Sequence, residues 1–93
     1  MTTKPLERTD RQTKLFDPYK VLLHNDEHHE MGYVQEALIK SVPQLSRAQA
    51  EDIMMEAHHK GTALVIVCPL EHAEMYCEQI KSFGLRSTIE ASG

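Results

Sequence analysis

Polar and ionisable side chains gather at two places in the sequence. The first is the run Asn-Asp-Glu-His-His-Glu at residues 25–30, and the second is the pair His58-His59. Asn offers a carbonyl oxygen, Asp a carboxylate and neutral His one ring nitrogen, so these residues supply hydrogen-bond acceptors. Three acceptors without a counter-cation suit a primary ammonium, which brings three donors. Capture of an N-terminal amine is one known mode of peptide recognition.

Two predicted strands must position these residues. Residues 19–24, YKVLLH, alternate in the manner of a half-buried strand that ends at the polar loop. Residues 62–68, TALVIVC, form a continuous apolar run, which predicts a well-covered strand just after His58. If these strands are neighbours in one sheet, the loop and His58 lie close together.

Three helices are expected between and after these strands. The first has one apolar face at Met31, Val34, Leu38 and Val42, and Pro43 stops it. The second begins at a capping box, with Ser46 at the N-cap and Gln49 at N3, and ends at Gly61 in a left-handed conformation. Its inner face is formed by Ala50, Ile53, Met54 and Ala57.

The third helix is predicted to begin with Pro69 at N1 and to end at Gly84. Its inner face consists of Ala73, Tyr76, Cys77, Ile80 and Phe83, and a short strand follows at 87–91. The order β-α-α-β-α-β predicts an α+β fold, a two-layer sandwich in which three helices cover one face of a three-stranded sheet. Residues 1–18 are polar and are predicted to form a disordered arm, followed by one domain at 19–93.

Composition narrows the function. A chain of 93 residues fits one domain, and a formal charge of -4 disfavours nucleic acid. No apolar run could span a bilayer and no signal-peptide core is visible, so we expect a cytoplasmic monomer without membrane contact. Cys68 and Cys77 are too far apart for a CxxC pair and are expected to be reduced thiols.

Two other functions deserve weight on the residues alone. Six histidines suggest a metal site, for which His24, Asp26, His28, His29 and His58 could supply ligands, although no HExxH or paired Cys/His spacing occurs. An enzyme could use His and Asp as a general base and a cysteine as nucleophile, but Cys68 ends an apolar strand and Cys77 lies on a helix inner face, where thiols are usually inert. We therefore expect no enzyme, no cofactor and no metal. A protein-interaction domain with some other partner is the main alternative.

Two stretches carry a resemblance to a known family. YKVLLHND and EDIMMEAHHKGTALV resemble the signatures of the ClpS family, the N-end rule adaptors of the Clp protease, and the resemblance covers about Tyr19 to Ala91. It implies an adaptor that binds the free α-amino group and the bulky hydrophobic first side chain of N-degron substrates. Such an adaptor delivers these substrates to a Clp AAA+ unfoldase, ClpA or ClpC, by docking on its N-domain.

Site residues follow from this resemblance position by position. It implies that Asn25, Asp26 and His58 hold the α-amino group and that Glu71 and Glu74 dock on the unfoldase. It also implies a side-chain pocket lined by Leu23, His29, Met31, Val34, Met54, Ala57 and Leu85. The chain departs from the family pattern at three places: His29-Glu30-Met31 replaces Thr-Pro-Met, Ala57 replaces Val, and Tyr76 replaces Lys.

Overall fold

The computed structural model describes residues 17–92 and contains six elements in the predicted order. These are β1 (Pro18–His24), α2 (Met31–Ser41), α3 (Arg47–Lys60), β2 (Thr62–Pro69), α4 (Leu70–Ser82) and β3 (Ser87–Ala91). Most of the predicted arm lies outside the described residues. Pro18, which was assigned to the arm, is instead the first residue of β1.

The sheet has the order β2-β1-β3, and β1 pairs antiparallel with both neighbours. His24 at the end of β1 lies opposite Thr62 at the start of β2. The backbone N–H of Asn25 continues this pairing by donating to the carbonyl of Gly61 at 2.9 Å. The two strands are therefore neighbours, and the polar loop lies beside the end of α3.

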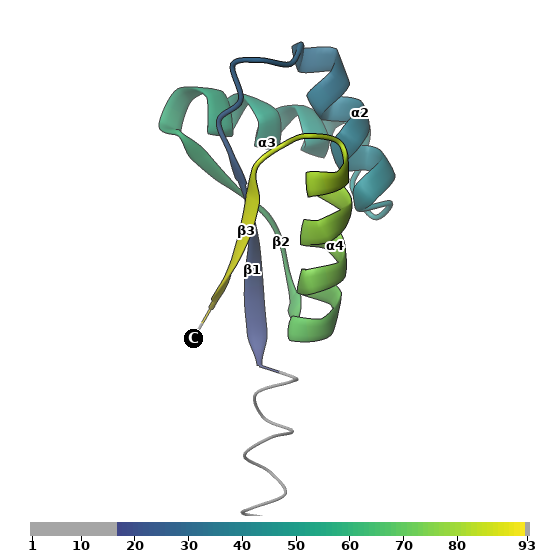
Figure 1. Cartoon of the computed structure of the whole chain (residues 1–93), viewed down its shortest axis with the longest axis vertical. Helices are drawn as coiled ribbons and strands as arrows, with labels where there is room; N and C mark the ends of the chain where they lie inside the picture. The colour runs from purple at the N-terminus through teal and green to yellow at the C-terminus, as the bar shows by residue number, and fades with distance from the viewer. Residues whose placement is uncertain (1–16, 93) are drawn as a thin grey trace, which may run out of the picture.

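The helices form the second layer (Figure 1). Helix α4 contacts all three strands, α3 contacts β1 and β2, and α2 packs on α3 and α4. The α+β sandwich predicted from the sequence is confirmed. Its largest fully buried side chains are Val21, Leu23, Leu38, Val42 and Ile80.

Helix α3 has both of its predicted ends. The Ser46 hydroxyl accepts from the backbone N–H of Gln49 at 3.0 Å, and the Gln49 side chain accepts from the backbone N–H of Ser46 at 2.8 Å. At the other end Gly61 has φ +95°, a left-handed conformation that favours glycine. These two ends fix where α3 stops and hence where its last turn places His58.

Three sequence expectations about burial and helix starts were wrong. Strand β2 is not well covered, since Leu64 is 44% and Val67 45% exposed. Helices cover one face of the sheet, and an irregularity in the pairing, where Val21 lies opposite Ile66 but Leu22 opposite Leu64, lets both side chains face solvent. Pro69 was expected at N1 of α4, but it ends β2 and is the N-cap of α4, one position earlier. Met31 begins α2 but is 46% exposed, because it lies at the edge of a surface hollow and not in the core.

Candidate functional site

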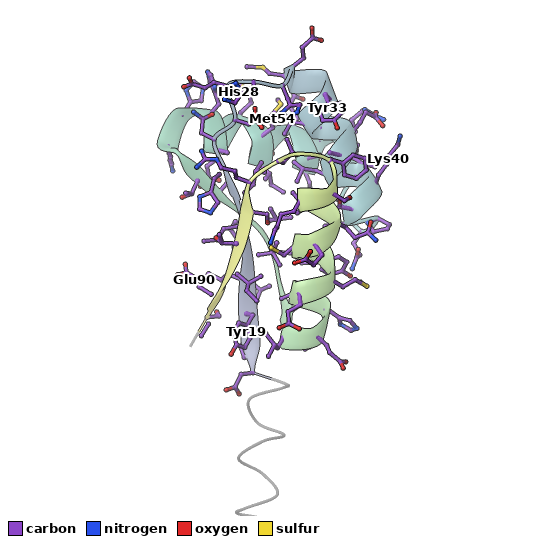
Figure 2. The ribbon with its side chains drawn as sticks, in the orientation of Figure 1. Tyr19, His28, Tyr33, Lys40, Met54 and Glu90 are labelled. Carbon is purple, nitrogen blue, oxygen red and sulfur yellow. The ribbon has the colours of Figure 1, made fainter. Side chains whose placement is uncertain are left out.

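A hollow lies where the loop 25–30, the start of α2 and the end of α3 meet. Figure 2 shows His28 on the loop, Met54 on α3 and Tyr33 on α2 at this same end of the molecule. The hollow is lined by Leu23, His24, Asp26, His29, Met31, Val34, Met54, Ala57 and His58. Its cavity volume is about 30 Å³, which is room for roughly two water molecules. It therefore combines an apolar lining with a few polar groups, as small ligand sites do.

Asp26 organises the loop. Its Oδ1 accepts hydrogen bonds from the backbone N–H groups of His28 at 2.7 Å and His29 at 2.8 Å. Its Oδ2 lies 2.7 Å from Nδ1 of the His29 ring. An ionised carboxylate has roughly four lone-pair positions, and these contacts use three. One acceptor position of Asp26 is therefore left for a ligand.

The charge of Asp26 is maintained by the same contacts. Its side chain is only 8% exposed, and burial by itself raises the pKa of a carboxyl group. The hydrogen bonds from His29 and His28 outweigh that burial, and the pKa of Asp26 lies below its ordinary value of 3.8. The hollow therefore has a negative charge that is nearly sheltered from solvent.

Of the other two residues expected to bind the amine, His58 lines the hollow and Asn25 does not. His58 lies in the last turn of α3 and lines the hollow. Asn25 lies just outside it, in a shallow depression that it shares with Asp26, Glu27, His28 and Arg86. The Asn25 amide nitrogen donates to Glu27 at 3.3 Å, so its carbonyl oxygen points the other way. Asp26 lines both depressions and joins Asn25 to the hollow.

Six of the seven predicted pocket residues line the hollow, and Leu85 does not. Leu85 is 4% exposed and belongs to the hydrophobic core. It follows Gly84 and is one of the buried residues of the core cluster. The prediction that Leu85 lines the pocket is therefore corrected: Leu85 is a core residue.

Four residues near the hollow were missed by the pocket prediction. His24 lines the hollow, and its Nε2 lies 2.7 Å from the hydroxyl of Thr88 on β3. Tyr33 stacks on His29 and donates to the carbonyl of Phe83 at 2.7 Å. Arg86 donates to the carbonyl of Asn25 at 2.6 Å, and Gly84 lies beside the His29 ring. Only the i, i+4 spacing of His29 and Tyr33 was visible in the sequence.

The remaining candidate residues lie away from the hollow. Glu71 and Glu74 are exposed on α4. Cys68 and Cys77 are free thiols, and burial raises the pKa of Cys68. Within residues 17–92, no three His, Cys, Asp or Glu side chains are grouped in a way that could hold a metal ion. No helix in this same part of the chain is long and apolar enough to cross a membrane.

The fold and the hollow define a small α+β domain with a site for a ligand that has a cationic head and an apolar neighbour. A family model described as ATP-dependent Clp protease adaptor protein ClpS matches residues 14–88. The chain belongs to the ClpS family.

Relatives agree over nearly the whole chain. An ATP-dependent Clp protease adapter protein ClpS from Gloeobacter violaceus is 51% identical over 97% of both chains. The protein of the same name from Synechococcus elongatus is 55% identical over 94% of this chain and 90% of its own. The chloroplastic adapter CLPS1 of Chlamydomonas reinhardtii is 45% identical over 99% of this chain and 57% of its own.

A solved structure shares the fold. Agrobacterium tumefaciens ClpS2, in a structure with bound L-phenylalaninamide, matches with a TM-score of 0.76 and 29% sequence identity. The match covers 82% of this chain and 98% of that one.

Proposed function

We propose that this chain is an adaptor that binds the free N-terminus of other proteins and delivers them to a Clp unfoldase. The observation that carries the proposal is the pairing of Asp26, nearly buried and negatively charged, with His58 at one apolar hollow. The related Agrobacterium protein binds L-phenylalaninamide, which has a free α-amino group beside an aromatic side chain. That ligand chemistry matches the groups assembled here.

In this proposal the α-ammonium of the substrate binds among three acceptors. Asp26 Oδ2 keeps one acceptor position, the Asn25 carbonyl oxygen points away from Glu27, and neutral His58 offers one ring nitrogen. A charge-assisted hydrogen bond contributes roughly 1.5–3 kcal/mol. The charge of Asp26 makes it the strongest of the three acceptors.

The first side chain of the substrate enters the apolar part of the hollow. With about 30 Å³ of free volume, the hollow must widen to admit a bulky group. Met31 is 46% exposed and Met54 lines the floor, and the unbranched methionine side chain adapts its shape readily. Burial of the first side chain adds roughly 1.5–3 kcal/mol. Together with the ammonium contacts this makes an affinity near about 1 μM attainable after the entropic cost of binding.

The partner is a Clp AAA+ unfoldase, ClpA or ClpC, docked through its N-domain on the exposed surface around Glu71 and Glu74. Both residues lie on α4, which begins at the end of β2 remote from the hollow. Bound substrate and docked unfoldase therefore occupy different surfaces. The double change Glu71→Lys and Glu74→Lys should weaken unfoldase binding at least about tenfold, because two negative charges on the docking surface become positive. Peptide affinity should be unchanged.

The proposal includes no chemical step on the substrate. Burial raises the pKa of Cys68, which keeps the thiol protonated and unreactive. Cys77 is buried on the inner face of α4.

Fluorescence anisotropy with labelled peptides tests the amine site. Peptides that begin with Phe, Tyr, Trp, Leu, Ile, Arg or Met are each measured with a free and with an acetylated N-terminus. We expect the bulky apolar peptides to bind and acetylation to abolish binding, because it removes the positive charge. Equal binding of free and acetylated peptides would refute the proposed function.

A further inference from the structure

The imidazole of His29 has a defined neighbour on each of three sides. Its Nδ1 edge is held by Asp26 Oδ2 at 2.7 Å. One face stacks on Tyr33, with ring centroids 4.9 Å apart and an interplanar angle of 13°. The Nε2 and Cε1 edge faces Gly84, where a Cβ would be in ordinary van der Waals contact 3.4 Å from Nε2.

These contacts determine which part of the ring faces the hollow. His29 lines the hollow and Tyr33 does not, so the ring stands between Tyr33 and the cavity. With one face stacked on Tyr33 and two edges turned to Asp26 and Gly84, the opposite face of the imidazole is the surface left to line the cavity. The hollow therefore has a flat aromatic wall at His29, together with the polar groups of His24, Asp26 and His58 and with aliphatic and thioether side chains.

The His29 ring is also less free to move than the Met31 side chain. Tyr33 is itself anchored, because its hydroxyl donates to the carbonyl of Phe83 at 2.7 Å. Met31, by contrast, is 46% exposed and has three rotatable bonds. When a side chain enters, the methionine moves more easily than the ring, so the entering group is pressed against the imidazole face.

From this geometry we infer that His29 is a specificity-determining residue, which makes the pocket prefer an aromatic first side chain over an aliphatic one of equal size. The inference rests on the proposed function, because it concerns what the same hollow accepts. Stacked aromatic pairs add about 0.5–1.5 kcal/mol beyond the area that they bury. This corresponds to a preference of about 2- to 12-fold.

The test compares peptides that begin with Phe or with cyclohexylalanine, its saturated analogue of similar shape. Two variants separate the roles of the ring. His29→Asn keeps a nitrogen in the place of Nδ1, so it retains the bond to Asp26 but lacks the aromatic face. His29→Phe keeps the aromatic face but loses the bond to Asp26.

In the unaltered protein we expect the Phe peptide to bind about 2- to 12-fold more tightly than the cyclohexylalanine peptide. His29→Asn should bind both peptides about equally, because the aromatic face that favours Phe is gone. His29→Phe should keep the preference while binding both peptides more weakly, because Asp26 loses a partner. A purely structural role of His29 would change both affinities together and leave their ratio intact.

The proposed function and the inference about His29 can be refuted separately. If free and acetylated peptides bind the unaltered protein equally, the proposed function is wrong and this inference with it. If acetylation abolishes binding but the unaltered protein does not distinguish Phe from cyclohexylalanine, the inference alone is wrong. It is also wrong if His29→Asn keeps the preference, and thermal unfolding of both variants verifies that each is folded.

Discussion

At the scale of single residues, Asp26 connects the stability of the loop to ligand binding. The same carboxylate accepts from His28 and His29 and lines the hollow. Its contacts within the loop are made before any ligand arrives, so the negative charge is already oriented. Little reorganisation is then needed when an ammonium binds, which favours affinity.

The lowered pKa of Asp26 predicts how the stability of the fold depends on pH. Because the pKa lies below 3.8 in the folded protein, the ionised carboxylate stabilises the fold fully above about pH 5 and does so progressively less as pH falls through the folded value. Asp26→Asn should cost about 1–3 kcal/mol near pH 7. This difference should shrink below pH 3.8. Urea unfolding of both proteins measures it, and the exposed Glu51→Gln serves as a control whose difference stays near zero.

Peptide affinity should depend on the acceptor at position 58. His58 lines the hollow, and a ring nitrogen there can accept from the ammonium. His58→Leu should weaken binding about tenfold because this acceptor is lost, whereas His58→Gln keeps an acceptor and should lose less. Peptide anisotropy measures both variants, and equal affinities of the two would assign the acceptor elsewhere.

The site was predictable from the sequence where local pattern decides, and not where packing decides. Asp26 lies just after the strand that ends at His24, and His58 lies in the last turn before the C-cap Gly61, so both could be placed from their neighbours in sequence. The partners of His29 come from α2 and from the turn before β3, and only the fold brings these segments together. Leu85 was misplaced for the same reason.

At the scale of elements, two glycines with positive φ frame the site. Gly61 has φ +95° and ends α3, and Gly84 has φ +87° and follows α4. A Cβ at Gly61 would meet nothing within 4 Å, whereas one at Gly84 would be in ordinary van der Waals contact with the His29 ring, 3.4 Å from Nε2. A substitution at either position is strained by the backbone, but only at position 84 would the new side chain touch the ring.

This difference gives a matched pair of variants. Gly61→Ala and Gly84→Ala should each lose about 1–2 kcal/mol of stability from the left-handed conformation. Both variants should keep the Phe to cyclohexylalanine ratio, because a Cβ at position 84 meets the His29 ring at an ordinary contact distance and leaves it in place. Thermal unfolding and peptide anisotropy measure the two effects. A changed ratio in Gly84→Ala alone would show that the ring is displaced.

Helix ends were easier to predict than strand burial. Ser46, Gln49 and Gly61 act through bonds within a few residues, so the capping pattern located α3 correctly. The exposure of Leu64 and Val67 depends on which face of the sheet the helices cover. The apolar sequence of residues 62–68 does not contain that information.

At the scale of the whole molecule, the site lies at the opposite end from the first and last described residues. Ser92 donates to the carbonyl of Pro18 at 3.0 Å, so the start of β1 and the end of β3 are adjacent. The loop 25–30 lies at the other end of β1 (Figure 1). Residues before β1 therefore join the domain far from the hollow.

Removal of residues 1–17 should for this reason leave peptide binding unchanged within about twofold. The ClpS resemblance implies that residues 1–17 engage the unfoldase, so in the proposed function the same truncation should slow degradation of a reporter substrate by the unfoldase and its peptidase severalfold. Anisotropy and a degradation assay measure the two effects separately. A loss of peptide affinity would show that the arm contributes to the site.

The central position of β1 also has a mechanical consequence. Strand β1 begins at Pro18, is hydrogen-bonded on both sides and ends at the loop 25–30, which is proposed to bind the amine. A force applied to the N-terminal end of the chain is directed along this strand. Antiparallel hydrogen bonds lie perpendicular to the strands, so such a force loads both ladders in shear, and many bonds must break together rather than one after another. The domain should therefore resist traction from its N-terminus, and if β1 did slide, the first structure to be lost would be the loop that holds Asp26.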